Sequence, residues 1–206
     1  VPIFEPMRNA TFIRSRLDQF QRTVVKAKEA AYVFDYLDVK GDYTAACLWH
    51  TQKIVKQTKN SFRTRIENFF YGWRWMTYAN PGDGELLIVF PKAAVTGVKK
   101  EVRADLDELA VYQLSSGTFP GGLAFSTILF PVRRAEPCLY ACENLKLQSG
   151  GRDAYPNADG VKLSLNGETV YVCSKNAAGV GLVQYGDVES DADVLYLGAK
   201  QGKLKV

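Results

Sequence analysis

The chain has 206 residues, of which 47% are hydrophobic, 12% aromatic and 23% charged. This composition indicates a folded protein with a real core and excludes a disordered chain, which would be poorer in aromatic residues. Its 4 cysteines are too few for a disulfide scaffold. No apolar run reaches the roughly 18 residues of a membrane-spanning helix.

The net charge of +4 is unevenly distributed along the chain. The first 80 residues contain 13 Lys and Arg against 7 Asp and Glu, whereas the remaining residues contain 13 against 15. This asymmetry is typical of a protein whose basic part meets an acidic partner. The partner could be a nucleic acid, an acidic protein surface or the other half of the same chain.

An extended arm is predicted for residues 1–10, which contain Pro2 and Pro6. After the arm, apolar residues recur at intervals of four and three, the spacing that forms one stripe along an α-helix. The residues of this first stripe are Ile13, Leu17, Phe20, Val24, Ala27, Ala31 and Phe34. A helix is therefore expected from about residue 11 to residue 37.

A second stripe follows a short connection, in which Gly41 can end one helix and Asp42 can cap the next. Its residues are Leu48, Thr51, Val55, Thr58, Phe62, Ile66 and Phe69. They predict a second helix from about residue 43 to residue 70. Because so short a link makes consecutive helices antiparallel neighbours, residues 11–79 are predicted to form a long helical hairpin.

The second predicted helix has a basic flank. Its basic side chains, in a stretch without acidic residues, are Lys53, Lys56, Lys59, Arg63 and Arg65. On a helix, Lys56, Lys59 and Arg63 would line one side of the apolar stripe, where aligned cations could contact phosphates. These residues are the candidate contacts for nucleic acid or for an acidic partner. The alternative is a helix face that is simply solvated or paired with acids of a neighbouring subunit.

An aromatic cluster lies at the end of the predicted hairpin. Its residues are Phe69, Phe70, Tyr71, Trp73, Arg74, Trp75 and Tyr78. Because Trp and Tyr dominate buried interfaces, the cluster is predicted to anchor the hairpin onto a sheet or another chain. The alternative is that its rings stack on bases or sugars beside Arg74.

The break at residues 80–84 begins a part of the chain, residues 80–206, that is rich in strand signals. Short apolar runs at Leu86–Phe90 and Leu123–Val132 suit buried strands. Asn166-Gly167 between two alternating segments predicts a β-hairpin with a type I′ turn. The predicted fold class is therefore α+β: the helical hairpin followed by a mostly antiparallel β-domain, either a sandwich or a barrel.

No arrangement of residues points to catalysis, a cofactor or a metal. His50 is the only histidine, and no sequence feature selects a nucleophile to act with it. Cys138 and Cys142 are spaced as half a metal site, but a second pair of ligands is missing. We therefore expect a protein that is not an enzyme. An enzyme with a cysteine nucleophile is an alternative that would need a thiol reactive near neutral pH.

These features together predict a structural component of a larger assembly, in contact with copies of itself or with other subunits. An arm, helices and a β-domain of this size are typical of virus and phage particle proteins, so a virion is the location suggested by analogy. Two alternatives stay open. One is a nucleic-acid-binding module that uses the basic helix. The other is a small-ligand-binding β-domain with Trp73, Trp75 and Tyr78 at its mouth.

Overall fold

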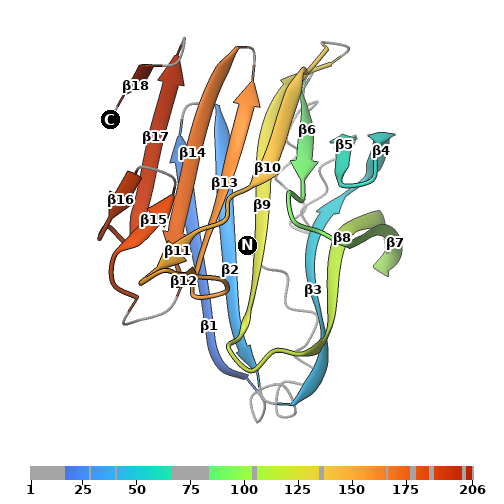
Figure 1. Cartoon of the computed structure of the whole chain (residues 1–206). Coiled ribbons are helices and arrows are strands. Elements are labelled where there is room, and N and C mark those ends of the chain that lie inside the picture. The colour runs from blue at the N-terminus through green and yellow to red at the C-terminus, as the bar shows by residue number, and fades with distance from the viewer. Residues whose placement is uncertain are drawn as a thin grey trace, which may run out of the picture.

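The structure, a computed structural model, describes part of the chain. The described residues are 17–27, 29–39, 41–65, 84–103, 106–134, 137–165, 167–176, 180–185, 188–200 and 203–205. Within them every regular element is a β-strand, and the strands form four open antiparallel sheets (Figure 1). No helix among these residues is long and apolar enough to cross a membrane. The predicted arm, residues 1–10, lies outside the described residues.

The strand order in the sheets brings distant segments of the chain together. The central six-stranded sheet consists of β1 (Leu17–Ala27), β2 (Ala30–Val39), β9 (Leu123–Arg133), β6 (Gly84–Val89), β5 (Ser61–Arg65) and β4 (Lys53–Gln57). The three-stranded sheet consists of β3 (Asp42–Thr51), β8 (Leu106–Thr118) and β7 (Val95–Arg103). The five-stranded sheet consists of β10 (Tyr140–Asn144), β13 (Ala158–Leu165), β14 (Glu168–Lys175), β17 (Val194–Lys200) and β18 (Lys203–Lys205). The small four-stranded sheet consists of β12 (Arg152–Asp153), β11 (Gln148–Ser149), β15 (Val183–Tyr185) and β16 (Val188–Ser190).

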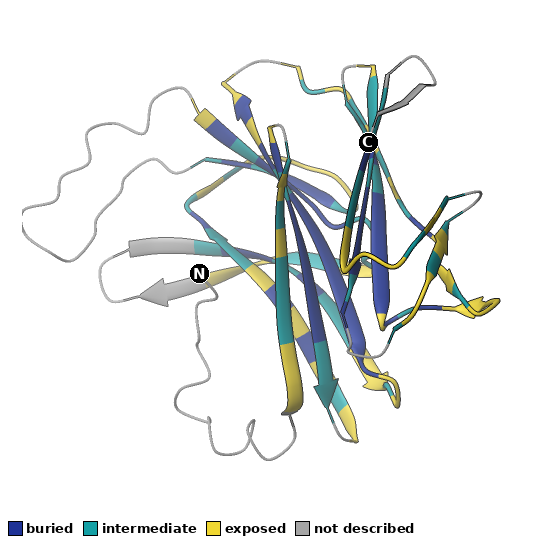
Figure 2. Cartoon of the chain, turned by 90° about the vertical axis from the view of Figure 1, so that its left-hand side faces the viewer, coloured by how far each residue is buried: buried dark blue, intermediate teal, exposed yellow. Residues whose placement is uncertain are grey.

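The central sheet lies between the five-stranded and three-stranded sheets, so both of its faces are covered (Figure 1). The core on one side includes Phe34, Val89, Ile128, Val161 and Val172. The core on the other side includes Phe62, Ile88, Phe90, Val111 and Phe125. Figure 2 shows the buried residues gathered along the middle strands and the exposed ones toward the strand ends and loops. The small sheet packs on the outer face of the five-stranded sheet through a separate cluster around Leu147 and Cys173.

The predicted helical hairpin is wrong, because residues 17–65 form the five strands β1 to β5. Side chains four residues apart share a face of a strand as well as a face of a helix, so half of the stripe spacing fits both structures. One interval of three, from Leu17 to Phe20, spans a β-bulge, and Val55 is itself the extra residue of another. Neither stripe is buried as a unit. In the first, Phe34 is buried whereas Val24 is 57% exposed, and in the second, Phe62 is buried whereas Val55 is 41% exposed.

Strand β2 shows why this part of the sequence lacks the alternation of apolar and polar residues that usually indicates a strand. It pairs with β1 on one side and β9 on the other, and both faces of the central sheet are covered. Consecutive residues from Tyr32 to Tyr36 are therefore all buried. Strands covered on both faces are near-continuous apolar runs instead of alternating ones. The β-branched and aromatic residues of this segment suit such a strand.

The β-hairpin predicted at Asn166-Gly167 is confirmed. Strands β13 and β14 pair antiparallel from Leu165 opposite Glu168 outward. Gly167 has a φ of 81°, in the left-handed region that the predicted turn needs. Asn166 itself lies outside the described residues. The strands expected at Leu86–Phe90 and Leu123–Val132 are also present, as β6 and β9.

Candidate functional site

Four of the predicted basic contacts lie together on one face of the central sheet, on the neighbouring strands β4 and β5. Lys53 pairs with Arg65 and Lys56 pairs with Arg63. Residues directly opposite each other in an antiparallel pair project from the same face. We call these four side chains the basic face. Strand pairing thus brings them together, although the helical frame in which they were predicted is wrong.

A β-bulge is what places both lysines on the basic face. In a regular strand, residues three apart project to opposite faces. The register of β4 against β5 shifts between Ile54 and Lys56, so that Val55 is an extra residue without a partner. The shift turns Lys56 to the side of Lys53. Bulges commonly redirect a side chain in this way, often beside functional sites.

The two arginines of the basic face bind one buried carboxylate, that of Glu85 on β6. Arg63 donates to Oε2 of Glu85, and Arg65 donates to Oε1 through two nitrogens, with the Nε bond at 3.1 Å. Burial raises the pKa of Glu85, but the hydrogen bonds from Arg65 and Arg63 outweigh it and leave the pKa below its ordinary value. Glu85 is therefore ionised at neutral pH. Four cations and one carboxylate give this cluster a formal charge of +3.

The lysines and arginines of the basic face differ in exposure. The arginine side chains are only 15% and 18% exposed, and Arg63 Nη2 also donates to the carbonyl of Arg133 at 2.7 Å. Lys53 and Lys56 are exposed. Glu85 thus holds the two arginines in place, and the two lysines beside them are exposed to solvent. The fifth predicted contact, Lys59, is exposed in the turn between β4 and β5, where its carbonyl accepts a 2.6 Å bond from Thr96 Oγ1.

The basic face adjoins the edge of the five-stranded sheet. Burial raises the pKa of the Cys138 thiol, and the charge of Arg63 partly opposes that rise. Arg63 contacts the carbonyl of Arg133 at the end of β9, from which the chain runs into β10, the edge strand of that sheet. Leu139 in this segment is 77% exposed.

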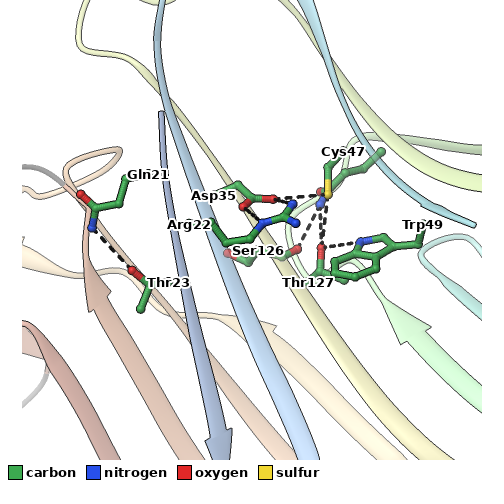
Figure 3. A network of polar contacts seen from close by, with 9 residues as sticks. Gln21, Arg22, Thr23, Asp35, Cys47, Trp49, Ser126 and Thr127 are labelled. Carbon is green, nitrogen blue, oxygen red and sulfur yellow. Dashed lines mark hydrogen bonds and ion pairs between the residues drawn. The ribbon is translucent and has the colours of Figure 1, made fainter. Parts of the chain in front are cut away.

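A second polar cluster lies between the central and three-stranded sheets and was missed by sequence reasoning (Figure 3). Arg22 donates to both oxygens of Asp35, at 2.5 and 2.7 Å, and its guanidinium lies 5.6 Å from the centre of the Trp49 ring. Trp49 Nε1 donates to Thr127 Oγ1 at 3.3 Å. The Cys47 thiol lies 3.7 Å from an Asp35 oxygen. Because these groups satisfy one another, the cluster joins the two sheets and offers no open site.

A third polar cluster joins the central sheet to the five-stranded sheet. Asp159 is 1% exposed and accepts bonds from Ser126 Oγ and from the Gly160 amide. Lys92 Nζ lies 3.6 Å from Asp159 and 3.0 Å from the centre of the Tyr155 ring. Burial raises the pKa of Asp159, although Lys92 and Ser126 act in the opposite direction. Burial likewise lowers the pKa of Lys92.

The sequence contains a signal for these buried acids that helix periodicity concealed. Asp35 stands inside the otherwise apolar segment Ala30–Leu37, and Glu85 stands at the start of the apolar segment Leu86–Phe90. A charged residue at such a position must be paired, because an isolated buried charge is too costly. Each acid therefore points to a cationic partner elsewhere in the chain.

The other predicted site residues divide into two groups. The aromatic cluster, Phe69, Phe70, Tyr71, Trp73, Arg74, Trp75 and Tyr78, lies outside the described residues. His50 lies half-buried on β3, paired with Ala110 of β8.

The four thiols are free, those of Cys47 and Cys173 buried and those of Cys138 and Cys142 partly buried. Burial raises the pKa of Cys47 to about 11 and the pKa values of Cys142 and Cys173 to about 12. Among the described residues, no three His, Cys, Asp or Glu side chains are grouped to hold a metal ion. The absence of catalysis and of metal stays a prediction.

Comparisons with known proteins give a likeness of fold. No family model and no curated protein matches the chain. Heparan sulfate lyase HepC from Pedobacter heparinus matches in two solved structures, one of them a mutant, each with a TM-score of 0.54 and 18% identity. The matches cover 79% and 80% of this chain but only 24% and 25% of the lyase chain. The chain thus shares its fold with part of that lyase and spans about a quarter of its length.

Proposed function

We propose that this chain is a β-sandwich module that binds an acidic polysaccharide through the basic face. The observation that carries the proposal is the cross-strand cluster of Lys53, Lys56, Arg63 and Arg65, which the bulge at Val55 completes. Exposed lysines above fixed arginines suit sulfate and carboxylate groups, which both side chains bind through charge-assisted hydrogen bonds. Glu85 holds the arginines in place before a ligand arrives.

A polysaccharide is favoured over a nucleic acid by two observations. The fold resembles part of a lyase named for heparan sulfate, a sulfated polysaccharide. The one aromatic side chain on β4 and β5, Phe62, is fully buried on the opposite side of the central sheet. These strands therefore supply no ring on which bases could stack, the usual device for binding single strands.

The proposal extends to the role of the module. By analogy with the lyase, of which this chain covers 24%, the module serves in polysaccharide processing. Its proposed contribution is to hold the acidic chain.

The proposal is tested by comparing three polymers on the same protein. Heparan sulfate should bind, neutral dextran should not, and the heparan sulfate affinity should fall as salt screens the charges. Calorimetric titration at low and physiological ionic strength measures all three. Tighter binding of duplex DNA than of heparan sulfate would indicate that the basic face binds nucleic acid instead. Equal binding of dextran and heparan sulfate would refute a charge-based site.

The role in a larger assembly stays a prediction with less support. It depended on the helical hairpin, which is absent, and on the aromatic cluster at residues 69–78, which is not described. Light scattering at two protein concentrations tests it directly. A mass that rises with protein concentration would make assembly through subunit contacts the favoured function.

A further inference from the structure

A shallow groove lies on the outer face of the five-stranded sheet. It has a volume of about 140 Å³ and is lined by Ala141, Cys142, Glu143, Lys162 and Ser164. Strand pairing sets Glu143 opposite Lys162 and Ala141 opposite Ser164. This volume is below the roughly 300–1,000 Å³ of pockets that enclose drug-sized ligands, so the groove suits a single small group.

Polar groups line this groove, and aromatic rings lie near one of them, Lys162. Lys162 Nζ donates to Glu143 Oε1 at 2.5 Å, with the two side chains 31% and 58% exposed. Tyr171 on β14 pairs with Lys162, whose ammonium lies 5.9 Å from the centre of the ring. The ring of Tyr185, from the small sheet, lies 5.5 Å from that of Tyr171. Both tyrosines are half-buried and pack against the core between the five-stranded sheet and the small sheet, beside Lys162.

The charges in the groove differ from those of the basic face. Lys162 and Glu143 cancel, so the groove has no net attraction for an anion. An exposed ion pair of this kind adds little to stability. The groove instead offers an ammonium donor, a carboxylate acceptor and the Ser164 hydroxyl, with aromatic rings near the ammonium group. A sugar ring matches these groups, because its hydroxyls form hydrogen bonds and its C–H face packs on an aromatic ring.

We propose that the groove is a second subsite for the same polysaccharide, taking the hydroxyl-bearing part of a sugar residue. This inference rests on the proposed function, since the acidic groups of the polymer bind at the basic face. The two sites are linked along the chain: Arg63 donates to the carbonyl of Arg133 at the end of β9, the next strand is β10, and Ala141 and Glu143 of β10 line the groove. A polymer that leaves the basic face over this edge reaches the groove.

The test separates the two sites by their response to salt. The double substitution Lys162→Met with Glu143→Gln removes both charged groups, and with them the hydrogen bonds they form as charged partners, without changing net charge. It should weaken binding of long heparan sulfate fragments by about tenfold, the size expected for losing hydrogen bonds to charged groups. The loss should be similar at low and high ionic strength. Short fragments, which cover only the basic face, should bind as before.

Substitutions of Tyr171 supply a matched pair. Tyr171→Leu removes the ring and should weaken binding of long fragments, whereas Tyr171→Phe keeps the ring and should bind them normally. Circular dichroism melts of both variants show whether the fold is kept, and the charge-conserving double substitution carries the test if Tyr171→Leu unfolds. If that double variant binds long fragments with unchanged affinity, the proposed subsite is refuted, whereas the proposal for the basic face is unaffected. Failure of heparan sulfate to bind the wild type at all would instead overturn the proposed function.

Discussion

Lys53 and Lys56 are three residues apart on β4 and yet project from the same face of the central sheet, because the bulge at Val55 lies between them. Their cross-strand partners, Arg65 and Arg63, are two residues apart and share that face by ordinary alternation. Two short strands thereby present four cations around one carboxylate. The basic face is a product of strand pairing and of one inserted residue.

Replacing Glu85 with Gln should destabilise the fold at neutral pH. The substitution leaves two largely buried guanidinium groups facing a neutral amide, and the expected loss is about 2–3 kcal/mol, reduced from a fully buried pair by their partial exposure. Because the pKa of Glu85 is lowered in the fold, its contribution is present at neutral pH and lost as pH falls through that lowered pKa. Urea unfolding of both proteins over the acid range measures the difference. An advantage of the wild type that persists unchanged at strongly acidic pH would contradict the pairing.

Replacing Asp159 with Asn should give the opposite pH dependence. The pKa of Asp159 is raised by burial, so the folded state holds its proton at a higher pH than the unfolded state does. The stabilisation from this group is complete below the ordinary carboxyl pKa and is lost as pH rises through the raised one. The stability of the wild type relative to Asp159→Asn should therefore increase on acidification from neutral to about pH 4. The same urea titrations measure it, and a relative stability that falls on acidification would refute the raised pKa.

Sequence reasoning succeeded where local chemistry decides the structure. Asn166-Gly167 specifies its hairpin through the φ preference of glycine, and no distant contact is needed. The runs that became β6 and β9 were found because each is short, apolar and bounded by Gly or Pro. These features belong to the strands themselves.

Sequence reasoning failed where long-range pairing decides the structure. The interval of four from Phe20 to Val24 is compatible with either a helix or a strand, and only the pairing of β1 with β2, and of β2 with β9, resolves it. The bulge at Val55 places Lys53 and Lys56 on one face of β4, which strand alternation alone does not predict. The basic residues could thus be identified from the sequence, whereas their pairing with Glu85 on β6 could not.

Replacing Gly167 with Val should cost about 1–3 kcal/mol, the range for a non-glycine residue held at positive φ. Nothing lies within 4 Å of the position that its Cβ would occupy, so the cost comes from the backbone alone. Gly181 is a suitable control, because its surroundings are equally open and its φ is not in that region. Thermal melts should show a loss for Gly167→Val and little for Gly181→Val. Equal melting temperatures would refute the predicted turn.

The buried thiols should be almost inert in the folded protein. With a pKa of about 11, the Cys47 thiol is ionised in only about one molecule in ten thousand at pH 7, and the thiolate is the reactive form. Cys142 and Cys173 should react more slowly still, since their pKa values are raised to about 12. A chromogenic disulfide reagent should label Cys138 first and all four thiols in urea. Fast native labelling of Cys47 would show that its environment differs from the one described.

The most direct test of the basic face is the heparan sulfate affinity of a charge-reversed protein across a range of salt concentrations. Lys53→Glu with Lys56→Glu should weaken binding by at least about tenfold at low salt and flatten the salt dependence, because the main attraction is removed. Lys99→Glu with Lys100→Glu makes the same change in net charge at exposed positions of β7, on a different sheet, and should leave most of the affinity. An equal loss of affinity in both variants would show that binding depends on the overall charge of the protein and not on the basic face. Unchanged binding in the first variant would contradict the site itself.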